Sequence, residues 1–259
     1  PIKLRFEKDE VKGTMFRGQK SLKMVTHCEA SQRFEQYYML EMLAYRMYNL
    51  ITDYSFKVRP LTITYDDSKT GRKDLDRFAF LIEDDSDVAE RNGLKKLEIP
   101  RIGPSRLDKT LTSEFSLFQY MIGNVDWAAL SGPDPKECCH NVKLIAPRPL
   151  EDDDIIYPIP YDFDSAGIVD APYAAPPNGL PIRQVTQRLY RGYCITNDTM
   201  PAAREKFLAN EAAILGTLKT QPGLRSSTQN KAKRYLERFF ETLRDDSDWE
   251  KQIMSKCRK

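Results

Sequence analysis

The pattern of hydrophobic and polar residues in the first 82 positions changes from the period of a strand to that of a helix and back. Residues 21–27 alternate, with Leu22 and Met24 on one face and Lys23 on the other, which is typical of a strand. Apolar residues then recur at helical spacing behind Ser31, a suitable N-cap. The predicted elements are strands at 2–6 and 21–27, a helix at 31–51, and strands at 56–65 and 77–82.

The character of the chain changes after residue 82, where an acidic run at 83–88 is expected to connect two parts. The later elements are predicted to be a helix at 112–122, extended segments at 141–145 and 155–160, a Pro/Ala/Gly-rich loop at 171–181, and helices from residue 201 with a break near 222–223. A mixed part followed by a mainly helical part indicates an α+β fold with two lobes, residues 1–84 and 85–259.

Composition narrows the class of protein. Of the 259 residues, 40 are Lys or Arg and 38 are Asp or Glu, so the net charge of +2 gives no basic excess that would attract nucleic acid. No apolar stretch approaches the roughly 20 residues needed to span a bilayer. We therefore expect a globular protein with neither a nucleic-acid partner nor a membrane span.

The cysteines bear on the cellular compartment. The chain contains Cys28, Cys138, Cys139, Cys194 and Cys257, and no Cys-x-x-Cys pair. Disulfides are expected if the protein is exported, and free buried thiols if it is cytosolic. The adjacent pair inside a loop favours an extracytoplasmic location, periplasmic or secreted, with a reduced cytosolic protein as the alternative.

Three polar residues carry the candidate chemistry. Asp126 stands in a Gly-Asn-x-Asp turn after a predicted helix, Asn141 starts an extended segment, and Asp162 follows the next one. Taken singly, each such piece is commonly structural. Together and in this order they are the parts that phosphoryl transfer needs, an Asp near the acceptor hydroxyl and an Asn and a carboxylate that hold Mg²⁺.

These motifs resemble those of bacterial kinase-like families related to spore-coat protein H and HipA. There, a Gly-Asn-x-Asp turn is followed by an Asn and then by a segment like Pro160-Tyr-Asp-Phe-Asp164. The resemblance implies a protein-kinase-like fold that binds ATP with Mg²⁺ or Mn²⁺. It implies that Asp126 is the catalytic-loop aspartate and that Asn141 and Asp162 are metal ligands.

The same resemblance implies a Lys–Glu pair in the N-terminal part. Lys23 on its strand would meet the phosphates of ATP, and Glu41 on the following helix would fix the ammonium group. Lys20 and Glu35 are competing candidates, because a Lys-rich strand and a Glu-bearing helix are common.

Further nucleotide contacts are expected from both sides of this strand. Glu83 and Ile82 fall where a hinge would hold the base through backbone groups. Gln19 lies in a turn that would have to replace a Gly-rich phosphate loop, which the chain lacks. Residues 127–139 form an insertion between Asp126 and Asn141 and are expected to loop out, with a disulfide able to pin them.

Two other groups have open roles. His140 is expected to orient the Asp126 loop through hydrogen bonds, with a catalytic acid or base as the alternative. A predicted helix carries Arg183, Arg188 and Arg191, which would be solvated or would bind an acidic acceptor.

The sequence leaves three functions to compare. The first is an ATP- and Mg²⁺-dependent atypical kinase that transfers the γ-phosphate to a hydroxyl of unknown acceptor, either a protein Ser/Thr, a small molecule or a sugar. The second is a pseudokinase, an interaction module that keeps the fold without catalysis. The third is a nucleotidyl transferase that attaches AMP using the same lobes.

Overall fold

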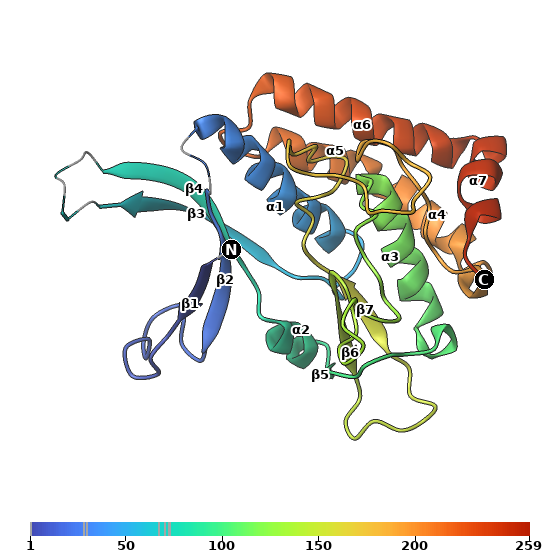
Figure 1. Cartoon of the computed structure of the whole chain (residues 1–259), viewed down its shortest axis with the longest axis horizontal. Coiled ribbons are helices and arrows are strands. Elements are labelled where there is room, and N and C mark those ends of the chain that lie inside the picture. Colours follow the sequence, from blue (N-terminus) through green and yellow to red (C-terminus); the bar gives the residue numbers. More distant parts are fainter. Residues whose placement is uncertain (1, 28, 30, 67, 70, 72–73) are drawn as a thin grey trace.

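The computed structural model describes residues 2–27, 29, 31–66, 68–69, 71 and 74–259. Within these residues the chain has a mixed α+β fold with seven α-helices and two antiparallel sheets (Figure 1). The helices are α1 (Glu35–Asn49), α2 (Asp85–Arg91), α3 (Lys109–Ile122), α4 (Met200–Ala209), α5 (Glu211–Lys219), α6 (Ser226–Arg244) and α7 (Asp246–Gln252).

The two sheets differ in size and position. The larger has the order β1-β2-β4-β3 and the smaller the order β5-β6-β7. Figure 1 shows the larger sheet on one side of the molecule and most helices on the other. The strands are β1 (Ile2–Arg5), β2 (Ser21–Val25), β3 (Val58–Tyr65), β4 (Leu75–Ile82), β5 (Lys95–Leu97), β6 (Val142–Ala146) and β7 (Tyr157–Pro160).

Helix α1 joins the larger sheet to the helical part. Most of its residues are buried, because it packs against β4 on one side and α5 on another. Its aromatic side chains contact the sheet and also a third element, helix α3. The Tyr45 ring lies 6.1 Å from that of Phe80 in β4, and the Tyr48 ring lies 4.4 Å from that of Phe118 in α3. Aromatic pairs at such distances add stabilisation beyond the area they bury.

The predicted α+β class is confirmed, and so is the break near 222–223, which falls between α5 and α6. One local prediction was incomplete and another was wrong. The acidic run 83–88 is not merely a connector, because Asp84 caps α2 through a 3.0 Å bond from the N–H of Ser86 and the helix continues through the run. Residues 183–191 contain no helix in the structure.

The C-terminus is held against the segment that leads to α4. Cys194 and Cys257 form a disulfide, and Tyr193 and Arg258 form a parallel β-bridge beside it. Cys28 lies outside the described residues. No helix among the described residues is long and apolar enough to cross a membrane.

Candidate active site

Asp126 lies in a tight turn that ends helix α3. Gly123 terminates the helix with a left-handed backbone (φ 68°), which glycine adopts without steric cost. The side-chain oxygen of Asn124 then accepts a 2.9 Å hydrogen bond from the N–H of Asp126. The indole N–H of Trp127 donates to the carbonyl of Asn124 at 3.1 Å. The turn is therefore fixed by its own sequence, and the Asp126 side chain remains 32% exposed.

Both carboxylate oxygens of Asp126 have a neighbour from the other end of the insertion. His140 Nε2 lies 2.8 Å from Oδ1, and the Asn141 amide donates to Oδ2 at 3.1 Å and to the Asp126 carbonyl at 2.8 Å. An antiparallel bridge between Ala128 and His140 closes the insertion at its base. The structure thus brings Asp126 and Asn141 together despite the 15 positions between them. His140 lies in the orienting position that the sequence favours.

The last two residues of the insertion, next to its base, are the adjacent cysteines. Cys138 and Cys139 are disulfide-bonded to each other, so the bond lies within the loop and links it to no other element. The N–H of Cys138 donates to the carbonyl of Ile99 at 2.9 Å. The loop is therefore held by main-chain contacts to the segment after β5.

Asp162 follows strand β7 and is held by contacts from two directions. Its N–H donates to the Tyr45 hydroxyl of α1 at 2.8 Å, and the preceding Tyr161 N–H donates to the Asn141 carbonyl at 3.2 Å. The next side chain, Phe163, is fully buried, with its ring 4.5 Å from Tyr45 and 5.4 Å from Phe118. Burial of Phe163 between α1 and α3 fixes where the carboxylate of Asp162 points.

The backbone of the two predicted metal ligands is unusual. Asn141 has φ 51° and Asp162 has φ 63°, and Asp170 is the one other non-glycine residue with positive φ in the described part of the chain. Asn and Asp tolerate this region better than other side chains, yet it remains sparsely populated and is enriched at functional sites. Two of the three such residues therefore coincide with the predicted ligand set.

The electrostatics of Asp162 place several charged groups near it. Burial raises the pKa of its carboxyl, and the carboxylates of Asp164 and Asp126 raise it further. The Lys23 ammonium opposes this rise. Asp162 is therefore a partly desolvated carboxylate among like charges, a surrounding that favours a bound cation or proton.

Lys23 and Glu41, the predicted pair, do not form an ion pair within the described residues. Lys23 instead lies beside Asp162, and its Nζ is 4.7 Å from the centre of the Tyr161 ring. Burial, followed by the neighbouring Lys143, lowers the pKa of Lys23. Glu41 is buried in α1, where burial and then the carboxylates of Asp162 and Asp164 raise its pKa well above the usual range. The charge of Asp162 thus influences both side chains, which make no ion pair with each other among the described residues.

A cavity of about 200 Å³ lies next to these groups. Its lining includes Lys23, Ile82 and Glu83, three residues that the sequence assigns to nucleotide binding. Strand pairing explains their proximity, because Lys23 of β2 stands opposite Ile82 of β4. The remaining lining residues are Lys3, Ser21, Phe56, Asp84, Asp85, Lys96, Lys143 and Tyr161.

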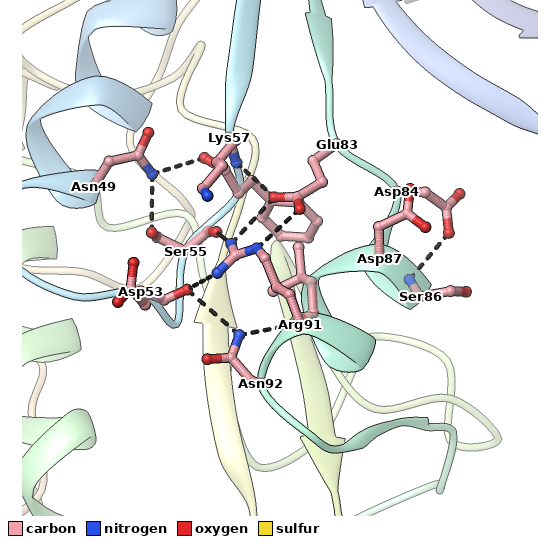
Figure 2. Close-up of polar contacts among 12 residues, drawn as sticks. Asn49, Asp53, Ser55, Lys57, Glu83, Asp84, Ser86, Asp87, Arg91 and Asn92 are labelled. Atoms are coloured by element: carbon pink, nitrogen blue, oxygen red, sulfur yellow. Dashed lines mark hydrogen bonds and ion pairs between the residues drawn. The ribbon is translucent and has the colours of Figure 1, made fainter. Parts of the chain in front are cut away.

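The Glu83 side chain is committed to the protein itself (Figure 2). Its carboxylate accepts hydrogen bonds from Arg91 at 2.9 and 3.1 Å and from the N–H of Lys57 at 2.8 Å. Arg91 also donates to the carbonyls of Asp53 and Ser55. This network ties Glu83, just before α2, and Arg91, at the end of α2, to the turn before β3. The N–H of Glu83 also donates to the carbonyl of Lys57 at 2.9 Å, so Glu83 can offer a ligand its backbone carbonyl but neither its N–H nor its carboxylate.

Gln19 lies outside this cavity lining. Its amide donates to the carboxylate of Asp87 in α2 at 2.7 Å, which links the loop before β2 to that helix. Gln19 could contact phosphates only if its hydrogen bond to Asp87 were broken.

Sequence reasoning missed one basic residue, Lys143, and assigned Arg188 and Arg191 to the wrong surroundings. Lys143 lines the cavity, and its Nζ lies 5.1 Å from the centre of the Tyr161 ring. It stands between the apolar Val142 and Leu144 in β6, and this alternation indicates that Lys143 points to the opposite face of the strand from these two buried side chains. Arg188 and Arg191 are neither solvated nor on a helix. Arg188 donates to the carbonyls of Tyr120, Met121 and Tyr235, and Arg191 donates to those of Val125 and Trp127.

The arginine contacts give the Asp126 turn a second support. Four backbone carbonyls at the end of α3 and in the turn after it receive a guanidinium donor, and the carbonyl of Tyr235 in α6 receives another. Charged donors make stronger hydrogen bonds than neutral ones. The Arg188 guanidinium also stacks 3.8 Å from the centre of the Tyr235 ring. These arginines therefore position the turn.

No protein-family model matches the chain, and a search of curated proteins finds no match either. A function must therefore be argued from the side chains that the fold brings together. The groups that it offers are an accessible hydrogen-bonded carboxylate, a buried carboxylate among like charges, and a lysine-lined cavity next to them.

Proposed function

We propose that the chain is an ATP- and Mg²⁺-dependent phosphotransferase with a two-lobed, protein-kinase-like fold. Residues 1–84 would form the smaller lobe and residues 85–259 the larger, with the nucleotide between them. The observation that carries the proposal is the grouping of Asp126, Asn141 and Asp162 beside a cavity lined by Lys23. The reaction would transfer the γ-phosphate to a hydroxyl acceptor.

Asp126 is proposed to orient that hydroxyl and to accept its proton. Its carboxylate is one-third exposed, so an acceptor can reach it. His140 and Asn141 hold the two oxygens in place, which reduces the reorganisation needed when the hydroxyl attacks. Arg191 keeps the carbonyls on either side of Asp126 in fixed positions.

Asn141 and Asp162 are proposed to hold Mg²⁺ or Mn²⁺. Burial and the nearby carboxylates of Asp164 and Asp126 raise the pKa of Asp162, and a bound cation would stabilise its ionised form. The described residues contain no group of three or more His, Cys, Asp or Glu that would bind an ion alone. That fits Mg²⁺, which typically takes one or two carboxylates and completes its shell with water and substrate phosphates. When bound, the ion would neutralise charge that develops on the transferred phosphoryl group.

Lys23 is proposed to contact the phosphates, together with Lys143 across the Tyr161 ring. Ile82 and the backbone of Glu83 would border the base. The roles of Glu41 as the partner of Lys23 and of Gln19 as a phosphate ligand stay predictions.

Labelled ATP tests the proposal. The protein is incubated with Mg²⁺ or Mn²⁺ and either γ-labelled or α-labelled ATP, alongside Asp162→Ala and the control Asp153→Ala, an exposed carboxylate in the β6–β7 loop. We expect transfer of γ-label that is lost in Asp162→Ala and kept in Asp153→Ala.

The other outcomes favour the competing functions. Transfer of α-label would indicate a nucleotidyl transferase. The lack of a Lys23–Glu41 ion pair in the described structure favours the second candidate, a silent interaction module. Failure to bind nucleotide at all would support that candidate and contradict both enzymes.

We also propose an extracytoplasmic, oxidising compartment. Cys194–Cys257 and Cys138–Cys139 are both within bonding distance, and such bonds persist mainly in exported proteins. Mass mapping of the natural protein without reduction would find both pairs if the location is right, and free thiols if the protein is cytosolic.

A further inference from the structure

Two adjoining cavities lie on a part of the molecule that the proposed nucleotide site does not use. Their volumes are about 250 and 630 Å³, and both are lined by Arg33, Tyr37 and Lys231. They form where the starts of α1 and α6 lie side by side (Figure 1) and where the segment 168–186 passes them. We call the two cavities together the basic groove.

Most charged side chains that line the basic groove are positive. Its lining contains Arg33, Arg183, Arg225 and Lys231, and its acidic member is Asp170. Lys231 pairs with Asp170 at 2.5 Å. The three arginine side chains have no ion-pair partner anywhere in the described part of the chain. Three positive charges therefore converge on the groove without compensation.

The groove has a fixed frame. The Gln36 side chain accepts from the N–H of Arg225 at 2.8 Å and donates to the carbonyl of Gly223 at 3.0 Å, which joins α1 to the start of α6. Leu40 of α1 and Pro172 of the passing segment add apolar wall. A ligand would thus find charges and apolar contacts already arranged, which reduces the cost of ordering.

The groove is also connected to the proposed catalytic turn. Ile168 lines it, and the N–H of Ile168 donates to the carbonyl of Ile122 at 2.9 Å. The adjacent N–H of Gly167 donates to the carbonyl of Gly123 at 3.1 Å. A ligand in the groove would therefore lie against the segment that joins the Asp162 loop to the turn of Asp126.

We propose that the basic groove binds an acidic polypeptide segment. Arg225 lines one cavity and Arg183 the other, so the charges are spread along an elongated surface that suits a chain with several carboxylates. A polynucleotide fits less well, because 38 acidic residues nearly balance the 40 basic ones and leave no wide positive field. If the segment belongs to the acceptor, the inference rests on the proposed function and names its substrate as an acidic protein.

Peptide binding tests the inference without any nucleotide. A fluorescent serine peptide rich in glutamate is compared with its glutamine counterpart by anisotropy, for the wild-type chain and for Arg33→Glu/Arg183→Glu. The matched control is Arg59→Glu/Lys219→Glu, which makes the same charge change at exposed positions that line neither cavity. We expect the groove variant to bind the acidic peptide at least about fivefold more weakly, and the control to bind it as the wild type does.

Added salt should weaken wild-type binding of the acidic peptide, because these charges are solvent-exposed. Equal binding of the two peptides, or equal weakening in both double variants, would overturn the inference. So would tighter binding of a single-stranded oligonucleotide that the groove variant abolishes. Since no ATP is present, failure of the labelling experiment would leave this result standing, and the reverse also holds.

Discussion

Two buried glutamates on neighbouring central helices have opposite surroundings. Glu114 of α3 has its carboxylate 2.6 Å from the Lys206 ammonium of α4. Glu41 of α1 has no ion-pair partner among the described residues, and its nearest charged influences are Asp162 and Asp164. Both side chains are almost entirely removed from solvent.

The difference separates a structural carboxylate from carboxylates at the proposed site. Burial raises the pKa of both glutamates, but Lys206 opposes the rise for Glu114, whereas two further carboxylates increase it for Glu41. A buried charge without a partner costs stability, so a fold with no use for it would be expected to lose it. A lysine thus opposes the pKa rise of the buried carboxylate of α3, whereas around Asp162 neighbouring carboxylates raise one another's pKa.

The largest expected effect is on ligand-dependent stability. At about 100 times Kd, Mg²⁺ with ATP should stabilise the wild type by roughly 3 kcal/mol. Asp162→Asn should lose most of this gain, since it removes a ligand of the ion, yet should be at least as stable as the wild type without ligand because it removes a desolvated charge. Denaturant unfolding with and without ligand measures both quantities.

Asp153→Asn is the control for this prediction and should keep the full gain. Equal stabilisation of wild type and Asp162→Asn by the nucleotide would contradict the assignment of Asp162. A large loss of stability in ligand-free Asp162→Asn would show that its carboxylate is structural, like that of Glu114.

Removal of the Lys206 charge should give the next largest effect. Lys206→Met leaves Glu114 buried and unpaired, and we expect a loss of about 1–2 kcal/mol in the free energy of unfolding. The loss is kept small because the Lys206 side chain is 41% exposed and its pair is partly screened. Lys109→Met, which breaks an exposed pair with Asp198, should change stability little. An equal loss in both variants would remove the distinction between buried and exposed pairs.

The parts of the fold and site that could be predicted are those determined by residues close together in the sequence. The strands and α1 follow from hydrophobic period, and the Asp126 turn from a Gly-Asn-x-Asp segment that makes its own hydrogen bonds. The start of α2 could also have been predicted from the sequence, since Asp84 caps the helix and Asp85 and Asp87 occupy its first turn. The prediction of a connector rested on the charge of the acidic run and not on its capping residues.

Long-range contacts account for what could not be predicted. Lys206 and Glu114 are 92 positions apart, and Arg188 is 68 positions from the carbonyl of Tyr120 that it binds. No spacing in the sequence marks such partners. The same holds for Lys23, because only the packing of β2 against the Asp162 loop decides that it lies beside Asp162 and apart from Glu41.

The smallest and most specific effect concerns Glu41. Because its folded-state pKa is raised, the native protein binds this proton more tightly than the unfolded chain does. Wild-type stability should therefore fall as the pH rises above the ordinary glutamate pKa of about 4.3 and through the raised value. Glu41→Gln removes the titrating group, so it should flatten this part of the profile and be more stable by about 0.5–1 kcal/mol at pH 8.

Glu114→Gln is the control and should not gain stability, since it removes the ion pair with Lys206. Denaturant midpoints across this pH range measure the effect, and a Glu41→Gln variant less stable than wild type at pH 8 would mean that Glu41 has a structural partner after all.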